Sequence, residues 1–564
     1  MEASVVSGDG EAQVIQSSTA KRGGWITFPF IIATMGGLSL ACGGWTMNLM
    51  VYLIEEFNVK SIDAAQIFNI VNGCTALFPI LGAIVADSFL GCFSVIWISS
   101  LFSLLGVVLI TVTSTHDSLR PPHCETGSSL CKSPSPFQLS ILYSGLALGC
   151  LGVGGTRYTL GTMGANQFDT SKNQGSFFNW YFFTLYVSTM VSVTALVYIE
   201  DSVSWVLGFG LSVLANLLGL IIFVLGNRFY RHVEANGSPF TGLARVIVAA
   251  IRKRKAFLST KPEDYYYQDE QLGGVEKAAA ALVPTKSLKF LNTAALKSEG
   301  DIKSDGSLAK PWRLCTVEQV EDLKALIKIM PLWSTGIFVA TPIAIQGSLV
   351  VLQALTMDRH IGPHFQIPAG SMVVFIFIFT AASLTLIDRF LYPTWKKLSG
   401  HPPTPLQRIA VGHVLNVLSM AVSAMVESKR LNTAKSHQKD SIVPISVIWL
   451  MPPLAIVGVG EAFHFPGQVS LYYQEFPASL KTTATAMVSL FIGIAYYLST
   501  AIVDSARRMT SWLPDDINHG RLDNVYWVIV VLGILNFTYF LVCCYFYEYQ
   551  NPHIEVEDSS KSEK

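Results

Sequence analysis

The sequence predicts an all-α membrane protein with 12 transmembrane helices arranged in two six-helix halves. The 564 residues are 51% hydrophobic and only 14% charged, and the mean hydropathy is +0.44, which is outside the range of ordinary soluble domains. Apolar windows of about 20 residues, the length needed to cross a bilayer, recur with short polar breaks. One long polar stretch, residues 227–323, interrupts them near the middle of the chain.

Six apolar windows precede this polar stretch and six follow it. The first six lie at residues 28–54, 65–88, 94–115, 139–160, 180–199 and 204–226. The second six lie at residues 324–354, 369–391, 406–427, 443–470, 482–505 and 525–547. The predicted domains are a disordered N-terminal tail (1–25), an N-terminal six-helix bundle (26–226), a linker (227–323), a C-terminal six-helix bundle (324–548) and a C-terminal tail (549–564).

The linker is predicted to lie in the cytosol because it is rich in basic residues, including the run Arg-Lys-Arg-Lys at 252–255. An even number of helices then places both terminal tails in the cytosol. Residues 241–255 are apolar with a basic end, which is typical of an amphipathic helix lying along a membrane surface. In this topology the loop 427–440 lies on the side of the membrane opposite the cytosol, although its four basic residues contradict the positive-inside rule.

Two six-helix halves joined by a cytosolic linker are typical of the major facilitator superfamily fold, in which substrate binds near the midplane between the halves. The sequence therefore favours a transporter. Equal numbers of basic and acidic residues, 39 of each, leave no net charge that would attract nucleic acid. The sequence lacks nucleotide-binding loops and cysteine or histidine sets at metal-ligand spacing. We expect no enzyme activity, no catalytic residues, no cofactor and no metal.

Two charged residues inside predicted helices are the main candidates for substrate binding: Arg157 in the fourth helix and Glu461 in the tenth. A charge at bilayer depth costs roughly 2.5 to 3.5 kcal/mol on insertion scales, so it is usually paired or functional. If the two helices face each other, as they do in this architecture, the charges offset each other. One interpretation is a fixed ion pair. The other is that the Arg157 guanidinium binds an anion, because its planar paired donors suit nitrate or a carboxylate.

His464 follows Glu461 by three residues and lies on nearly the same helix face. Both residues are candidates for proton coupling or pH sensing. The alternative for His464 is that it is buried and contributes only to packing. The glycine-rich run 145–161 around Arg157 predicts close helix packing or close approach of the backbone to a ligand. Cys124 and Cys131 share a polar loop and could form a disulfide if that loop is extracytoplasmic.

Several stretches together resemble the plant nitrate/peptide transporter family, the plant branch of the proton-dependent oligopeptide transporters. The resemblance extends from about residue 24 to residue 527. The stretches are NLMVYL (48–53), GAIVADSFLG (82–91), GANQFD (164–169), FFNW (177–180), PWRLCTVEQVE (311–321), GEAF (460–463) and WLPD (512–515). The resemblance implies the major facilitator fold, alternating access, and a cavity lined by a cation from the fourth helix and an acid from the tenth. Arg157 occupies the position where the family usually has lysine, and Glu461 occupies that of the acid.

The sequence departs from the family pattern at two places. The first-helix proton-coupling signature, Glu-x-x-Glu followed by Arg or Lys, is replaced by Met35-Gly36-Gly37-Leu38-Ser39, which argues against ordinary proton-driven uptake. In the seventh helix, Ile343 stands where a nitrate-selective member of the family has histidine. An anion would then bind to Arg157, with Thr341 as a neutral hydrogen-bond donor.

Four further stretches are similar to the nitrate excretion transporter subgroup: ITFPF (26–30), LIEEFNVKS (53–61), AFHFPG (462–467) and DDINHG (515–520). This likeness implies efflux of nitrate across the plasma membrane, with chloride as an open alternative. The expected partners are a small inorganic anion and the lipid bilayer, and protein partners are left open. Two other functions also stay open: a proton-coupled importer of a larger organic anion or peptide-like solute, and a carrier-like receptor that does not transport.

Overall fold

The computed structural model describes residues 23–122, 132–232, 239–267, 284–285, 287–298, 300–302, 310, 312–363, 365–437, 442–475 and 483–547. The chain forms two compact units. The first contains Met1–Met47, Leu81–Leu119 and Pro136–Ala235, and the second contains Asn48–Ile80, Arg120–Ser135 and Asn236–Lys564. Residues 48–80 lie before the predicted linker, yet they pack with the helices that follow it. In this respect the units differ from the predicted six-helix halves.

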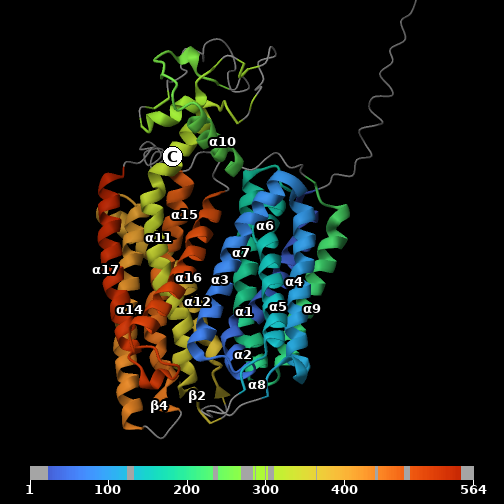
Figure 1. Ribbon diagram of the computed structural model, residues 1–564, viewed down its shortest axis with the longest axis vertical. Coiled ribbons are helices and arrows are strands. Elements are labelled where there is room, and N and C mark those ends of the chain that lie inside the picture. The colour runs from blue at the N-terminus through green and yellow to red at the C-terminus, as the bar shows by residue number, and fades with distance from the viewer. Residues whose placement is uncertain are drawn as a thin grey trace, which may run out of the picture. The chain divides into compact units, whose positions relative to one another are not determined.

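The first unit is built from helices (Figure 1). They are α1 (Phe28–Met47), the end of α3 (Ser61–Val85), α4 (Gly91–Thr115), α5 (Pro136–Thr156), α6 (Thr159–Ala165), α7 (Ser171–Val191), α8 (Val197–Ser202) and α9 (Trp205–Leu225). Helix α1 packs against α7 and α9, and α4 packs against α5 and α9. The contact between α1 and α9 is very close, because a Cβ on Gly37 would lie 2.6 Å from the Ala215 carbonyl oxygen.

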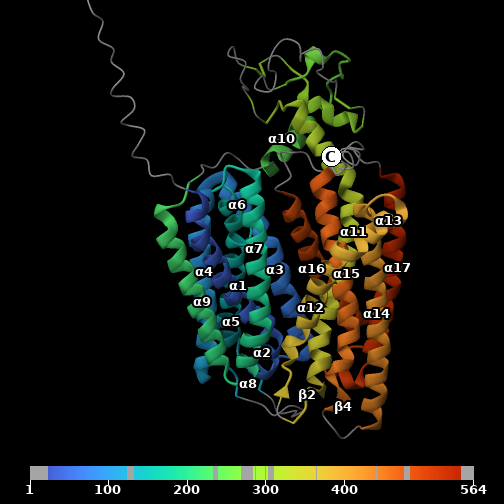
Figure 2. The ribbon, with the colours of Figure 1, turned by 180° about the vertical axis from the view of Figure 1, so that it is seen from behind.

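The second unit contains the remaining long helices, and α11, α14 and α17 lie side by side in both views (Figures 1 and 2). The helices are α2 (Leu49–Glu55), most of α3, α10 (Pro239–Arg252), α11 (Val317–Leu355), α12 (Val374–Leu386), α13 (Tyr392–Ser399), α14 (Pro405–Ser436), α15 (Met451–Glu475), α16 (Thr483–Met509) and α17 (Leu522–Phe546). Four short strands complete it: β1 (Met357–Asp358) pairs in parallel with β4 (Val443–Ser446), and β2 (His360–Ile361) pairs antiparallel with β3 (Phe365–Gln366).

Helix α11 is the central element of the second unit. Its apolar window is 78% buried, whereas that of α17 is 22% buried. The helix begins with a capping box, in which the Thr316 hydroxyl accepts from the Gln319 amide (3.2 Å) and the Gln319 side chain accepts from the Thr316 amide (3.3 Å). It therefore starts seven residues before the predicted span at 324.

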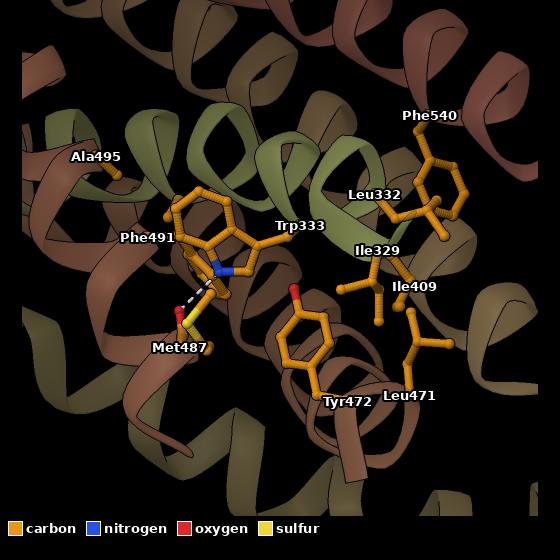
Figure 3. Close-up of a cluster of buried hydrophobic side chains, with 11 residues drawn as sticks. Ile329, Leu332, Trp333, Ile409, Leu471, Tyr472, Met487, Phe491, Ala495 and Phe540 are labelled. Atoms are coloured by element: carbon orange, nitrogen blue, oxygen red, sulfur yellow. Dashed lines mark hydrogen bonds between the residues drawn. The ribbon is translucent and has the colours of Figure 1, made fainter. Parts of the chain in front are cut away.

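A cluster of buried side chains joins α11 to α14, α15, α16 and α17 (Figure 3). At its centre Trp333 packs against Phe491, and its indole Nε1 donates to the Met487 carbonyl (2.9 Å). Tyr472 of α15 and Phe540 of α17 belong to the same cluster. Burial of large side chains stabilises this unit, and the indole finds a partner for its only polar atom.

The predicted linker contains a second small core. Val246 and Ala249 of α10 pack on the 3₁₀ helix η10 (Lys289–Ala295) and on the first turns of α11. A buried ion pair between Lys253 and Asp301 (2.7 Å) closes this core. The predicted amphipathic helix is present as α10, with one face packed on protein. Its position on a membrane surface stays a prediction.

The described residues contain 11 stretches that are long and apolar enough to cross a membrane. One of them, Ser61–Thr115, contains both α3 and α4, so the 11 stretches supply the 12 predicted crossing helices. The fold class is therefore an all-α membrane protein, as predicted. Three π-helical turns occur within the described helices: η3 (Ala86–Leu90), η5 (Ser192–Leu196) and η12 (Ile387–Leu391).

One predicted loop is largely helical. Helix α14 continues to Ser436, so most of the region 427–440 extends the predicted span at 406–427. Within it, Arg430 is fully buried and forms an ion pair with Glu427 (2.7 Å). The prediction that this region is a loop was wrong, because a polar helical turn continues beyond the apolar window. One of its four basic residues is neutralised inside the protein and carries little weight in the positive-inside count.

Candidate functional site

Arg157 lies in the first unit, in the turn that separates α5 from α6. Its amide donates to the Val153 carbonyl (3.1 Å), and its own carbonyl accepts a hydrogen bond from the Tyr181 hydroxyl (2.8 Å). The backbone is thus held at both polar groups, while the side chain is exposed. Among the described residues of this unit, Asp169 forms an ion pair with Arg231. The Arg157 guanidinium has no carboxylate partner there.

The glycine-rich run before Arg157 packs α5 tightly against α4. A Cβ on Gly152 would lie 2.4 Å from the Ser103 Cβ, and one on Gly155 would lie 1.8 Å from the Ser99 Oγ. Both distances are far below van der Waals contact, so only glycine fits at these positions. Close helix packing, one of the two expectations for this run, is therefore what these glycines provide.

The first-helix positions that differ from the family pattern lie in α1 and pack against apolar neighbours. Met35 is 4% exposed and belongs to a core cluster with Ile31 and Tyr181. Leu38 is 7% exposed. Side chains at 35 and 38 therefore contribute to the core of the first unit, and neither of them carries a proton-binding group.

Glu461 lies in the middle of α15, where helix α12 comes very close. A Cβ on Gly458 would lie 2.7 Å from the Ile376 carbonyl oxygen of α12. The close packing of α12 on α15 places Thr380 beside Glu461. The Thr380 hydroxyl donates to the Gly458 carbonyl (3.0 Å) and also lies within hydrogen-bond reach of the Glu461 carboxyl. The half-buried acid therefore has a polar neighbour on the adjacent helix.

A small cavity in the second unit, too tight to hold a water molecule, has Glu461 in its wall. Ile343 of α11 lines the same cavity, so an apolar side chain lies beside the acid at the position where a nitrate-selective member of the family has histidine. The other lining residues are Val339, Gly412, Asn416, Val457, Gly460 and His464. The cavity is small and mostly apolar, with the carboxyl, one amide and one imidazole as its polar groups.

Thr341 also lies on α11 but does not line this cavity. It is 3% exposed, and its hydroxyl donates to the Ile337 carbonyl one turn earlier (2.8 Å). To donate to an anion, the hydroxyl would have to turn away from the helix backbone. Its predicted role stays a prediction.

His464 is 1% exposed and packs between the rings of Phe465 and Phe491. The nearest polar ring is His413 of α14, whose centroid lies 6.2 Å away. His413, Asn416 and Asn536 form polar surroundings that sequence analysis did not single out. A search of the apolar windows for uncharged polar side chains could have found all three.

Comparison with known proteins identifies the family. The sequence pattern of the POT family matches residues 93–519, which is more than half of the chain. The chain belongs to the POT family. Two relatives from Arabidopsis thaliana, Protein NRT1/PTR FAMILY 2.6 and Protein NRT1/PTR FAMILY 2.7, are each 55% identical to it, and the match covers 97% of each chain. This places the chain in the plant NRT1/PTR branch of the POT family.

Solved structures support the fold. A crystal structure of an auto-inhibited POT family peptide transporter matches with a TM-score of 0.70 at 17% identity, covering 93% of this chain and 98% of that chain. At this level of identity the likeness shows the major facilitator fold alone. Membership of the POT family makes the chain a multi-pass membrane transporter and not an enzyme.

The GANQFD motif (164–169), one of the stretches that carry the family resemblance, has a clear structural role. Gln167 accepts from the Arg231 amide (2.7 Å) and donates to its carbonyl (3.1 Å), and its own carbonyl accepts from the Gly24 amide (2.7 Å). Hydrogen bonds from Arg231 hold the pKa of the exposed Asp169 carboxyl below its usual range. The motif therefore ties together the ends of α6 and α9 and the start of α1.

Two predictions about residue pairs are not tested by the structure. Arg157 lies in the first unit and Glu461 in the second, so their predicted pairing stays a prediction. Cys124 and Cys131 lie outside the described residues. The seven cysteines that the structure describes form no disulfide with one another.

Proposed function

We propose that this chain mediates efflux of nitrate, with chloride as a second candidate, across the plasma membrane by alternating access. The observation that carries the proposal is the Arg157 side chain, a permanent cation that comes just after the run of glycine and apolar residues at 145–155. A guanidinium presents paired donors in one plane, which match the planar oxygens of nitrate. In this proposal the linker and both termini lie in the cytosol.

The packing of α1 supports a route without the usual proton-coupled uptake. Met35 and Leu38 are buried apolar side chains at the positions where the family resemblance implies acids. Moving one negative charge out of a cell whose interior is about 100 mV negative is favourable by about 2.3 kcal/mol. At about 1.4 kcal/mol per tenfold, this sustains an anion concentration ratio of roughly 40 without protons.

The proposed cycle uses both charged candidates. Nitrate enters from the cytosolic side and displaces the Glu461 carboxylate from the Arg157 guanidinium. The two six-helix halves then rock to expose the anion on the other side. Glu461 either takes up a proton or pairs again with Arg157, and this choice distinguishes anion–proton efflux from uniport.

Nitrate efflux from proteoliposomes that contain the full chain tests the role of Arg157. We expect Arg157→Ala to lose roughly 30-fold or more of the nitrate flux, because removing one partner of a desolvated charged hydrogen bond costs about 2–5 kcal/mol. Arg157→Lys keeps the charge but loses the paired donors, so its flux should be intermediate. Arg228→Ala is a matched control, because Arg228 stacks on Phe229 at the end of α9. Undiminished flux in Arg157→Ala would exclude the proposed anion site.

Three further measurements separate the other functions. Reversal potentials with nitrate exchanged for chloride identify the preferred anion. Uptake of a larger organic anion that increases at acid pH would favour the proton-coupled importer. Nitrate binding without flux would favour the carrier-like receptor.

A further inference from the structure

Helix α11 contains a proline at a point where three helices of the second unit meet. Pro342 has no N–H, and its ring clashes with the carbonyl of the residue four positions earlier, which bends a helix. That earlier residue is Phe338, and both residues line a small cavity between α11, α14 and α17. The cavity has room for about one water molecule. The bend in α11 therefore lies beside a space of molecular size.

Three polar side chains line this cavity and are almost fully buried: His413 is 2%, Asn416 is 5% and Asn536 is 6% exposed. In each of them one atom has no hydrogen-bond partner among the residues that the structure describes. These atoms are His413 Nε2 and the Oδ1 atoms of the two asparagines. Buried polar atoms in native proteins are nearly always hydrogen-bonded, either to protein or to ordered water. The cavity therefore suits a ligand that can form hydrogen bonds with all three atoms.

The two asparagine side chains are oriented by α11. Asn416 Nδ2 donates to the Val339 carbonyl (2.7 Å), and Asn536 Nδ2 donates to the Thr335 carbonyl (3.1 Å). Because each amide nitrogen is used in this way, the atom that remains on each side chain is an acceptor. The cavity thus has one acceptor from α14 and one from α17.

The His413 ring can supply the matching donor. It stacks on Phe540, with 4.7 Å between the ring centroids and 26° between the ring planes, and this contact fixes its orientation. A neutral imidazole carries one N–H donor and one acceptor nitrogen. With the proton on Nε2, the cavity has one donor and two acceptors. A single water molecule matches this pattern, because it can accept one hydrogen bond and donate two.

The charge and size of the cavity favour water over other small ligands. Among the described residues of its wall there is no Asp, Glu, Lys or Arg, so no side chain there balances the charge of an ion. Apart from the three polar side chains, the wall is apolar. A buried water needs two to four polar partners, and this cavity supplies three.

The cavity lies at one end of a row of polar contacts between α11 and α14. Gln346 donates to Ser423 (2.9 Å), and Gln353 donates to Glu427 (2.6 Å). Val339, Gln346 and Gln353 follow one another at intervals of about two helical turns, so they lie on the same face of α11. The contact at the Val339 carbonyl is therefore the first in this row, and the unpaired acceptors of the cavity adjoin it.

We propose that one water molecule binds beside the Pro342 bend, donates to the Oδ1 atoms of Asn416 and Asn536, and accepts from the Nε2–H of neutral His413. The water joins α14 to α17 at the point where the proline has removed a hydrogen bond from the backbone of α11. It is a structural ligand of the second unit, and its binding does not depend on the transported substrate.

X-ray radiolytic labelling of the purified full chain tests this site directly. Hydroxyl radicals that an X-ray pulse generates from a bound water oxidise a methionine beside it, whereas a methionine in a dry core is oxidised slowly. Met420 is 1% exposed and lines the cavity. Met372 is 0% exposed, does not line the cavity and is the matched control. We expect Met420 to be oxidised roughly 5-fold faster or more, by mass spectrometry, because the water lies against it. A Met420 rate as low as that of Met372 would overturn the proposal.

Two variants connect this labelling to the polar atoms. Asn536→Leu removes one acceptor, so Met420 oxidation should fall to the rate of Met372. Ile529→Val changes the same wall but keeps all three polar side chains, so Met420 oxidation should stay as in the wild type. Unchanged oxidation of Met420 in folded Asn536→Leu would assign the labelling to another water and overturn the proposal. If Asn536→Leu does not fold, the comparison of the two methionines in the wild type still decides.

The ¹⁵N NMR spectrum of histidine side chains in the full chain is an independent test, with the His413 signals assigned by His413→Gln. We expect a neutral ring with its proton on Nε2 and magnetisation transfer from that proton to water. A His413 ring with a bare Nε2 would overturn the proposal. Neither measurement uses nitrate flux, so a failure of the proposed function leaves this test intact, and the reverse also holds.

Discussion

At the scale of single residues, the most completely satisfied charge in the described chain is Arg430. Its guanidinium donates to both oxygens of Glu427 (2.8 and 2.7 Å), to Thr356 (3.0 Å) and to Asn518. Glu427 also accepts from Gln353 (2.6 Å). A buried ion pair is strongly stabilising only when it is compared with a variant that lacks one of the two charges. In such a variant the remaining charge lies in the interior without solvent or a partner.

This network gives a stability prediction. Arg430→Met should lower the free energy of unfolding by about 3–5 kcal/mol, because Glu427 remains buried without its partner. The double variant Glu427→Leu with Arg430→Met should recover much of that loss. Chemical denaturation of the detergent-purified chain measures both effects. Lys429→Met is the control, because Lys429 is exposed and lies over the Trp449 ring. Equal stability of the Lys429 and Arg430 variants would contradict the prediction.

At the scale of elements, a group of four charged side chains joins the start of α3 to the end of α16. Asp515 accepts from Lys60 (2.6 Å) and from Arg507 (2.9 Å), and Arg507 also pairs with Asp63. Helix α3 also contacts α11, where Asn69 donates to Ser348 (3.4 Å). Lys60 and Asp63 precede the linker in sequence, while Arg507 and Asp515 follow it. If the two six-helix halves rock as proposed, this ion-pair group has to open in one state.

Weakening the ion-pair group should shift the population of the open state. Arg507→Gln is expected to raise the labelling rate of a cysteine introduced as Ser348→Cys by roughly 2- to 5-fold, because partly exposed ion pairs contribute about 0.5–1 kcal/mol. A thiol reagent with mass-spectrometric readout measures the rate, because Ser348 is fully buried here. Arg508→Gln is the control, since Arg508 pairs with Asp504 within α16. Equal labelling rates in the two variants would show that the group does not hold this contact closed.

The sequence analysis located nearly every long helix but misplaced several of their ends. Helix α11 starts at Val317 and α14 continues to Ser436, because capping residues and polar turns extend a helix beyond the apolar window that hydropathy detects. Arg157 and Glu461 could be found from sequence because charges stand out in apolar windows. The neighbours of Glu461 could not, because the proximity of Asn416 depends on how α14 packs on α15, and that packing is set by Gly412 and Gly460.

At the scale of the whole molecule, two of the places where the chain passes between the units lie at irregular points of helices. The first passage falls between Met47 and Asn48, where α1 ends and α2 begins. The second falls between Ile80 and Leu81, one residue after Pro79 inside α3. Proline removes one helical hydrogen bond, so the helix bends more easily at this point.

The position of Pro79 predicts a role in the transport cycle. Pro79→Ala restores an N–H that can donate to the Thr75 carbonyl, so the variant should be as stable as the wild type or more stable, by up to about 3 kcal/mol. The turnover rate for nitrate should fall while the dissociation constant stays unchanged, because a stiffer α3 resists the motion between states. Pro331→Ala in α11 is the control, since this proline lies well inside the second unit. Equal turnover in the two variants would exclude a bending role for Pro79.

The π-helical turns η5 and η12 affect how the faces of these helices are assigned. Each lies within an otherwise continuous helix, η5 between α7 and α8 and η12 between α12 and α13. A π turn contains roughly one residue more than an α turn, and one residue occupies about 100° around the helix axis. A helical wheel drawn without a break through either segment therefore assigns side chains after the turn to a face about 100° from their true one. Lipid-facing and protein-facing positions should be counted separately on the two sides of each turn.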